Sequence, residues 1–329
     1  MGGLTFDQGG KVGAIVMLDG IIIVRKEPDF TSNDVVAKMR GICRQKKIGH
    51  TGTLDPAATG VLPLCLGRGT KLCDMLTDKD KEYVAEFLLG KVTDTQDLTG
   101  TVLQEREVTV TEQEVRDAIL SFLGEYDQIP PMYSALKVNG KKLYELAREG
   151  REVERKARRV RITELEILEM QLPVVKVRVV CSKGTYIRTL GADIGEKLGC
   201  GAAMQSLVRT RVGRFDLREA HTLSELEQIR DSVGLESVLI PVESVFEDNE
   251  RLLLLPEFDR MLDNGNAVLP QWIAGRADGG ELPKNRMMRR ESVVKKDGTV
   301  RMCTSDGVFK GLYEYQAAEK KYRPVKMFL

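Results

Sequence analysis

The chain has 329 residues, of which 42% are hydrophobic and 30% are charged, and its formal net charge is +1. This composition is typical of a soluble globular protein of about two domains and excludes an intrinsically disordered chain. No apolar run approaches the ~18 residues that a membrane helix needs, so we expect a cytoplasmic protein without a membrane partner. The six cysteines form no C-x2-C pair and there are only two histidines, so we expect no metal and no cofactor.

The first half of the chain combines strand and helix patterns, following residues 1–17, which we expect to be an unstructured extension. A buried strand is predicted at 20–24, and Thr31-Ser32 offers the N-cap of the next helix. Thr111 and Glu114 form a capping box ahead of another helix. The predicted elements here are strands at 20–24, 61–66 and 83–89, helices at 31–43, 70–76 and 111–122, and a loop at 46–60.

The second half continues the mixture without a regular strand-helix-strand repeat. We predict paired strands at 160–168 and 174–181, a short helix at 143–147, and helices at 186–198 and 222–230. This order indicates an α+β fold with a mixed or largely antiparallel sheet. A boundary is predicted near 247–250, followed by short strands at 292–294, 300–304, 308–315 and 324–328 that suggest a small β-barrel.

Charge is distributed unevenly along the chain. Residues 131–215 carry 18 basic and 9 acidic side chains, residues 216–264 carry 4 and 13, and residues 265–329 carry 13 and 7. Two basic stretches separated by an acidic one are consistent with two surfaces that face a polyanion. Chance clustering of surface charge explains the same pattern equally well.

The loop at 46–60 holds the first candidate chemistry. It contains one carboxylate, Asp55, together with His50, two lysines, three glycines and three threonines. Glycine allows close approach of the main chain to a ligand, and lysine, threonine and main-chain N–H groups suit a phosphate backbone. An Asp-Pro turn without chemistry is the alternative for Asp55.

Two further segments combine residue types that bind RNA or support catalysis. The segment 181–190 runs from a strand end into a helix, where Arg188 could pair with a buried carboxylate or lie on a solvated helix face. The segment 128–144 interleaves aromatic, basic and glycine residues, which suits stacking on unpaired bases. A surface loop with an amphipathic helix would show the same pattern.

Several long motifs, in order, resemble one family. The sequence G-H-T-G-T-L-D-P-A-A-T-G-V-L-P-L-C-L-G at 49–67 closely resembles the active-site motif of TruB-type tRNA pseudouridine synthases. The resemblance continues at D-K-x-Y (80–83), T-D-T-Q-D (93–97), Q-I-P-P-M-Y-S-A-L-K-V-N-G-K-K-L-Y-E-L-A-R-x-G (128–150) and C-S-K-G-T-Y-I-R-T-L (181–190), and covers nearly all of 18–230. The tail at 307–325 looks like a PUA-type RNA-binding module.

The resemblance implies a role for individual residues. Asp55 occupies the position of the essential aspartate, Tyr83 that of the tyrosine that stacks on the target base, and Arg188 that of the arginine that pairs with the aspartate. His50 matches the histidine beside the flipped nucleotide. The remaining residues implied to contact the substrate RNA are Lys26, Thr51, Gly52, Pro131, Lys137, Tyr186 and Leu207.

The resemblance also implies a domain organisation and a partner. It predicts a catalytic domain at 18–248, with a T-arm-gripping insertion at about 124–152, and a PUA-like domain at 249–329. The expected partner is the T-arm of tRNA, bound by a monomer that needs no protein partner. One motif departs from the family pattern K-P-x-G-x-[ST]-S, because Glu27 and Asp29 stand at its Pro and Gly positions.

The implied reaction is conversion of the T-loop uridine 55 of tRNA to pseudouridine, an isomerisation that needs no cofactor. Asp55 could attack C1′, deprotonate C2′ or add to the pyrimidine ring, and the sequence leaves these routes open. Two alternatives to this function remain at this point. The chain could be a non-catalytic RNA-binding protein or tRNA folding chaperone, or a dyskerin-like enzyme that acts on ribosomal RNA.

Overall fold

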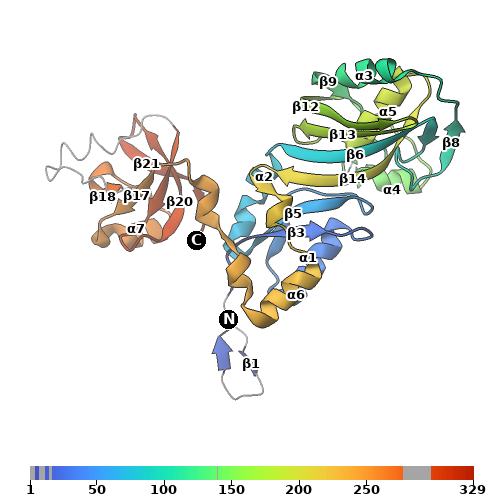
Figure 1. Cartoon of the computed structure of the whole chain (residues 1–329). Helices are drawn as coiled ribbons and strands as arrows, with labels where there is room; N and C mark the ends of the chain where they lie inside the picture. Colours follow the sequence, from blue (N-terminus) through green and yellow to red (C-terminus); the bar gives the residue numbers. More distant parts are fainter. Residues whose placement is uncertain (1–3, 7–11, 15–16, 139, 277–297) are drawn as a thin grey trace. The chain divides into compact units, whose positions relative to one another are not determined.

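A large mixed sheet is the main element of residues 20–241 in the computed structural model (Figure 1). The model describes residues 4–6, 12–14, 17–138, 140–276 and 298–329. The sheet has ten strands in the order β16-β3-β5-β14-β6-β13-β12-β9, with β15 beside β14 and β4 beside β5. Its central pairs are antiparallel, except that β14 runs parallel to β5. The predicted α+β class with a mixed, largely antiparallel sheet is therefore confirmed.

The strands of this sheet and its smaller hairpins have the following bounds. The large sheet consists of β3 (Gly20–Lys26), β4 (Ile48–His50), β5 (Thr59–Leu66), β6 (Lys81–Leu89), β9 (Gly124–Gln128), β12 (Arg158–Gln171), β13 (Val174–Cys181), β14 (Ala202–Val212), β15 (Phe215–Asp216) and β16 (Ile240–Pro241). Two further pairs are formed by β7 (Lys91–Thr93) with β8 (Val102–Glu105), and by β10 (Lys137–Val138) with β11 (Lys141–Lys142).

The principal helices include three that begin at side chains that cap them. They are α1 (Ser32–Ile42), α2 (Cys73–Thr77), α3 (Glu112–Leu120), α4 (Leu143–Arg148), α5 (Ile187–Lys197) and α6 (Leu223–Ser232). Thr31, Thr111 and Thr222 each form a capping box with an acidic residue three positions later, in front of α1, α3 and α6. Each box satisfies helix N–H groups that have no partner within the helix, so these starting points are readable from the sequence.

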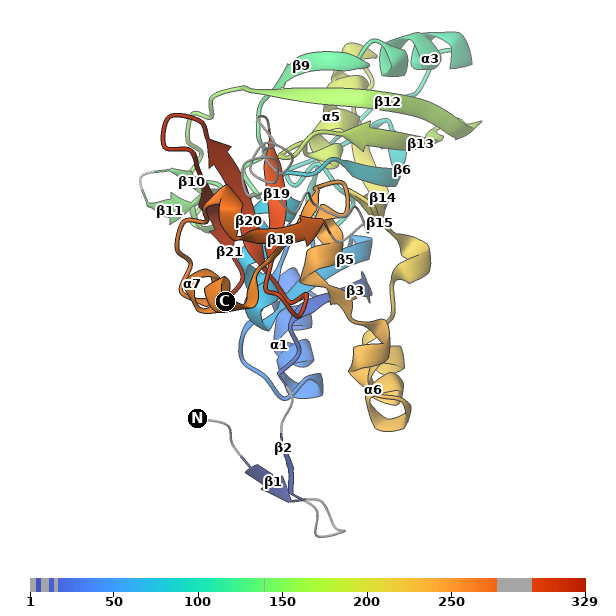
Figure 2. The same cartoon turned by 90° about the vertical axis from the view of Figure 1, so that its left-hand side faces the viewer.

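One face of the sheet is covered by α3 and α5 (Figure 2). Alternate residues of β6, among them Tyr83 and Phe87, are buried there together with apolar residues of both helices. Gly191 lets α5 approach β6, because a Cβ atom at this position would lie 2.5 Å from the Phe87 ring. The close fit places the N-terminal end of α5 beside the strands that carry the candidate site.

The other face of β6 and β13 carries a network of ion pairs. Arg178 pairs with Glu82, Glu164 and Glu166 at 2.9–3.2 Å, and Lys176 pairs with Glu86 at 3.2 Å. Cross-strand pairs of opposite charge stabilise a solvated sheet face. Alternate side chains of β6 therefore point to a buried face, which carries Tyr83, and to a solvated face, which carries the ion pairs.

The C-terminal region forms its own five-stranded sheet in the order β18-β17-β19-β20-β21. Its strands are β17 (Arg251–Leu254), β18 (Ile273–Arg276), β19 (Thr299–Cys303), β20 (Phe309–Gln316) and β21 (Lys321–Met327), with the helix α7 at Asp259–Asp263. The turn at Asp306-Gly307 joins β19 and β20. The last strand begins at Lys321, earlier than predicted, because an edge strand tolerates Pro324. The predicted strand at 292–294 lies outside the described residues.

Contacts divide the chain into two compact units. One comprises Ile22–Leu64 and Cys73–Ser237, and the other comprises Met1–Ile21, Cys65–Leu72 and Val238–Leu329. All the candidate site residues named above lie in the first unit. None of the helices in the described part of the chain has the length and apolar character needed to cross a bilayer.

Two sequence expectations need correction. Residues 1–17 were expected to be unstructured, but β1 (Leu4–Phe6) pairs with β2 (Val12–Ala14). The segment 46–60 was expected to be a loop throughout, but Ile48–His50 form the short strand β4, which pairs with β5. A three-residue strand leaves too short an apolar pattern to be read before its partner is known.

Candidate active site

The loop that carries Asp55 is fixed to the end of β3 by Lys26. The Lys26 ammonium donates hydrogen bonds to the main-chain oxygens of Pro56 (2.9 Å) and Ala58 (2.6 Å), on the C-terminal side of Asp55. Burial lowers the pKa of Lys26 to about 8, although the nearby Asp55 carboxylate opposes this shift. Ser32 accepts a hydrogen bond from the N–H of Leu54 at 2.9 Å. The loop is thus held on both sides of its carboxylate.

Asp29, which stands where the family has glycine, adopts a left-handed conformation with φ = 66°. Glycine favours this region, and aspartate tolerates it better than most residues. The N–H of Asp29 donates to the oxygen of Pro56 at 3.1 Å. The turn therefore keeps its contact with the Asp55 loop despite the substitution.

Asp55 and Arg188 form an ion pair across the site. A terminal nitrogen of Arg188 lies 3.4 and 3.3 Å from the two oxygens of Asp55. The Arg188 side chain is 6% exposed and that of Asp55 is 37% exposed. Arg188 also donates to the carbonyl oxygens of Tyr133 (2.5 Å) and Thr95 (3.5 Å). The arginine is therefore fixed by its surroundings, while the carboxylate remains open to a ligand.

A second carboxylate, Asp97, faces Arg188 from the turn after β7. Its oxygen lies 3.9 Å from the guanidinium, and its other oxygen accepts hydrogen bonds from Thr95 and Thr99. Burial raises the pKa of Asp55, Arg188 acts to lower it, and Asp97 adds to the rise. The site thus holds two carboxylates around one guanidinium.

Tyr83 lies on β6 and is 8% exposed. Burial raises the pKa of its phenol, while Arg209 acts in the opposite direction by charge and by hydrogen bonding. Asp55 is among the charges that act on this phenol. Leu54 and Ala58, which flank Asp55, pack in the same core cluster as Tyr83, so the structure brings together the Asp55 loop, Arg188 and Tyr83, which the resemblance had assigned to one site.

His50, Thr51 and Gly52 form the N-terminal side of the same loop. The N–H of Gly52 donates to Nδ1 of His50 at 3.3 Å. Burial and the charge of Arg209 lower the pKa of His50, which favours the neutral imidazole. The hydroxyl oxygen of Thr51 is buried and has no hydrogen-bond partner among the described residues. These groups can offer polar contacts without adding charge beside Asp55.

The other residues predicted to contact RNA differ in whether they interact with Asp55. Tyr186 stands at the N-cap position of α5 without a side-chain capping bond, and both Asp55 and Arg188 act on the pKa of its phenol, which burial raises. Leu207 lies on β14, opposite Ala85 of β6, and packs on the same core. Pro131 is buried near Tyr133, whereas Lys137 is exposed on β10. No described contact brings Pro131 or Lys137 to Asp55.

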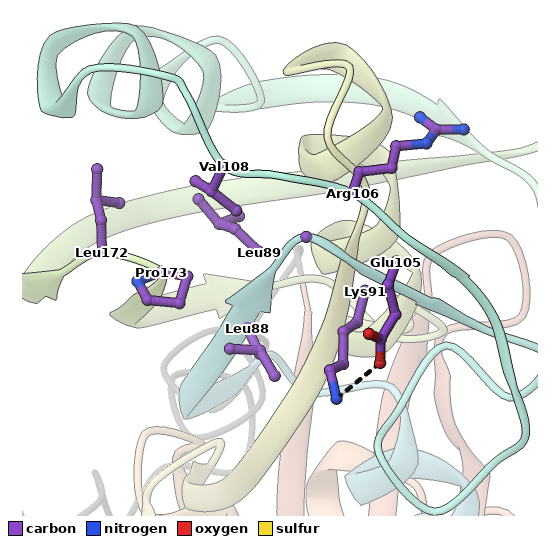
Figure 3. Close-up of a pocket in the computed structure, with 9 residues that line it drawn as sticks. Leu88, Leu89, Lys91, Glu105, Arg106, Val108, Leu172 and Pro173 are labelled. Atoms are coloured by element: carbon purple, nitrogen blue, oxygen red, sulfur yellow. Dashed lines mark ion pairs between the residues drawn. The ribbon is translucent and has the colours of Figure 1, made fainter.

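A cavity of about 350 Å³ lies elsewhere (Figure 3). Its lining includes Leu89, Val108 and Pro173, and Lys91 pairs with Glu105 at its rim at 3.2 Å. Leu89 is six residues from Tyr83 along β6, which is about 20 Å in an extended strand. This cavity is therefore separate from the carboxylate site.

Asp55 is the more exposed of the two carboxylates, with 37% of its side chain exposed against 12% for Asp97. Within the described ranges, no group of three or more His, Cys, Asp or Glu side chains could hold a metal ion. A carboxylate held by one guanidinium in a mostly buried setting can act as a nucleophile or as a base.

Comparison with known proteins identifies the family. A family model described as "TruB family pseudouridylate synthase (N terminal domain)" matches residues 40–187, and one described as "tRNA pseudouridylate synthase B C-terminal domain" matches residues 188–247. The tRNA pseudouridine synthase B of Lachnoclostridium phytofermentans is 48% identical over 320 residues, which cover 95% of this chain and 100% of that protein. The chain belongs to the TruB family of pseudouridine synthases.

Other relatives agree with this membership of the TruB family. The tRNA pseudouridine synthase B of Alkaliphilus oremlandii is 46% identical over 256 residues, covering 78% of this chain and 85% of that protein. Among solved structures, a chain in the crystal structure of a Cbf5-Nop10-Gar1 complex matches with a TM-score of 0.66 and 27% identity. That match covers 94% of this chain and 85% of that chain.

Two polar residues of this TruB-family site were not among the predicted site residues. Asp97 is part of the quoted T-D-T-Q-D motif, so the family resemblance already contained the signal. Arg209 is buried on β14, but the same stretch also carries Arg211, and nothing in the sequence distinguishes the buried arginine from its neighbour. The sequence could not show that Arg209 faces Tyr83, which is more than a hundred residues away.

Proposed function

We propose that this enzyme converts the T-loop uridine 55 of tRNA to pseudouridine, with Asp55 as the catalytic carboxylate. The observation that carries the proposal is the Asp55–Arg188 pair beside Tyr83 in a chain of the TruB family. The reaction breaks the N1–C1′ bond and joins C5 of the same base to C1′. The C5 hydrogen leaves as a proton, so no electrons are gained or lost overall.

The ionised form of Asp55 is the one that serves this reaction. Attack on C1′, deprotonation of C2′ and addition to the ring all require a free carboxylate lone pair. Arg188 favours that ionised form against the burial that raises the pKa of Asp55. The uridine must first leave its stack, which costs a few kcal/mol, and stacking on Tyr83 would offset this cost.

The neighbouring residues have supporting roles in the proposal. His50, Thr51, Gly52, Tyr186 and Leu207 surround the flipped nucleotide, and Lys26 holds the loop. Pro131 and Lys137 belong to the segment 124–152, which we propose grips the T-arm. We further propose that residues 18–248 form the catalytic domain and residues 249–329 a PUA-like RNA-binding module, in a cytoplasmic monomer that needs no protein partner.

A tRNA substrate is favoured over ribosomal RNA. The named relatives at 48% and 46% identity are tRNA pseudouridine synthases, whereas the chain of the Cbf5-Nop10-Gar1 complex is 27% identical. A purely RNA-binding protein would not need a buried arginine directed at a partly open aspartate, because such a pair is costly to desolvate.

Release of tritium from T-arm RNA labelled with [5-³H]uridine tests the function directly. Formation of pseudouridine frees the C5 hydrogen, so the protein should release one tritium for each RNA that carries the T-loop uridine. RNA with cytidine at that position, labelled at its remaining uridines, is the control and should release none. Binding of the RNA without tritium release would favour the RNA-binding alternative.

The pH dependence of the reaction should report the ionisation of Asp55. The single-turnover rate constant should fall as the pH drops through the raised pKa of Asp55, because protonation removes the reactive lone pair. Asp97→Asn removes a negative charge that raises this pKa, so the acid limb should move to lower pH. Stopped or quenched single-turnover assays across pH 4–8 would measure it.

Asp94→Asn is the matched control for this pH profile. Asp94 lies in the same turn, but its carboxylate accepts a hydrogen bond from the N–H of Thr101 and is not among the charges that act on Asp55. The acid limb of the pH profile of Asp94→Asn should coincide with that of the wild type. An unmoved or alkaline-shifted limb in Asp97→Asn would contradict the electrostatic role given to Asp97.

A further inference from the structure

Arg209 is a fully buried cation in the middle of β14. Its exposed fraction is 1%, and burial lowers its pKa from the usual value. Its described hydrogen bonds go to main-chain oxygens: Val61 at 2.8 Å, Gly52 at 3.2 Å and Thr53 at 3.5 Å. A buried charge that is bonded only to neutral oxygens is expensive. An apolar residue would fill this core position at a lower cost, so the guanidinium calls for an explanation.

The strand pairing places Arg209 directly opposite Tyr83. The two residues are cross-strand partners in the antiparallel β14–β6 pair, so their side chains share a face of the sheet. The charge of Arg209 acts on the Tyr83 phenol and opposes the rise in its pKa that burial causes. Arginine has only donors, so in a hydrogen bond between the two side chains the phenol oxygen would accept and its own O–H hydrogen could point elsewhere.

The other neighbour of Arg209 is a glycine that permits close approach of the two main chains. Gly60 on β5 pairs with Arg209, and a Cβ atom at Gly60 would lie 2.2 Å from the Arg209 oxygen. Gly60 also has φ = 106°, which side chains rarely adopt. The close approach brings the guanidinium under the loop that carries Thr53 and, two residues later, Asp55.

One side chain therefore connects the two groups whose relative position matters for catalysis. Its guanidinium donates to Thr53 and Gly52 of the Asp55 loop, and its cross-strand partner on β6 is Tyr83. The planar group offers several donors in fixed directions, whereas a lysine ammonium acts as a single point. Simple support of the loop is the competing explanation, and it would require only the bonds to Gly52, Thr53 and Val61.

We propose that Arg209 is a positioning residue that fixes the Tyr83 phenol relative to Asp55. The inference rests on the proposed function, in which Tyr83 stacks on the flipped base. Arg209 occupies a lone pair of the phenol oxygen and thereby sets the ring plane and the direction of its O–H bond. It does not touch the reacting atoms, so its effect on the rate passes through Tyr83.

A double-mutant cycle separates positioning of Tyr83 from support of the loop. Arg209→Lys should lower the single-turnover rate constant of tritium release about 100-fold, with a change of less than about threefold in RNA affinity. In the Tyr83→Phe background, which lacks the phenol oxygen, the same substitution should cost only a few-fold. Equal losses in the two backgrounds would overturn the proposal in favour of loop support.

Arg211→Lys is the matched control on the same strand. Arg211 pairs with Glu82 at 3.6 Å and donates to the oxygen of Gly213, so it does not face Tyr83. Any effect of this substitution should be the same with tyrosine and with phenylalanine at position 83. Thermal unfolding of every variant monitors folding, and Arg209→Gln replaces Arg209→Lys if the lysine variant does not fold.

A second readout does not depend on activity. Site-specific incorporation of 3-fluorotyrosine at position 83 provides a ¹⁹F resonance in the free protein. Arg209→Lys should move this resonance, whereas Arg211→Lys should leave it in place. An unmoved resonance in Arg209→Lys would overturn the proposal. Absence of tritium release by the wild type would count against the proposed function, while the ¹⁹F comparison would still decide whether Arg209 positions the phenol.

Discussion

Asp55→Asn should reduce tritium release from labelled T-arm RNA by at least about 10⁴-fold. The amide has almost the shape of the carboxylate but lacks the anionic lone pair that all three proposed routes use. Losses of this size are typical when the reactive group itself is removed. The measurement is the single-turnover rate constant with enzyme in excess over RNA.

Binding of RNA should survive this substitution. Asp55 is one partly exposed side chain. The loop around it is held by Lys26, Ser32 and Arg209, and all three side chains bond to main-chain groups of the loop. The dissociation constant of Asp55→Asn should therefore stay within about threefold of the wild type. Release of tritium at a rate near that of the wild type would remove Asp55 from the chemistry.

Arg188→Lys should lower the rate constant by about 10²–10³-fold. One guanidinium reaches Asp55, the Tyr133 oxygen and the Thr95 oxygen, with Asp97 nearby, and a lysine ammonium cannot span these positions. The variant keeps the positive charge, so a large loss would show that geometry matters as well as charge. The pH profile should be recorded together with the rate constant.

Arg106→Lys provides the comparison for this arginine. Arg106 is exposed, donates to the oxygen of Gly199, and lines the separate cavity of Figure 3. The rate constant of Arg106→Lys should remain within about twofold of that of the wild type. A similar result for Arg188→Lys would count against a fixed pair with Asp55.

Local signals made the helices and most strands predictable. The boxes at Thr111 and Thr222 involve residues three positions apart, and the alternation from Tyr83 to Leu89 lies within one strand. The position of Asp55 in a glycine-rich segment was also visible. Each of these features depends only on residues that are close together in the sequence, so it can be predicted without the tertiary structure.

The assembly of the site could not be derived from such local patterns. The Asp55–Arg188 pair joins residues 133 positions apart, and its prediction came from the family resemblance and not from spacing. The contact of Arg209 with Tyr83 depends on the register of β14 against β6. Register is set by the whole sheet, so the sequence of β14 alone could not show which of its arginines is buried or which residue it faces.

The attachment of the Asp55 loop has a consequence for how the enzyme recognises its substrate. Lys26, Ser32 and Arg209 hold the loop from three directions in the free protein, so the catalytic carboxylate is preorganised before any ligand arrives. Most of the conformational change on binding then occurs in the RNA. Discrimination between RNAs would follow the ease with which each one everts its uridine, so selectivity becomes a property of the deformability of the RNA.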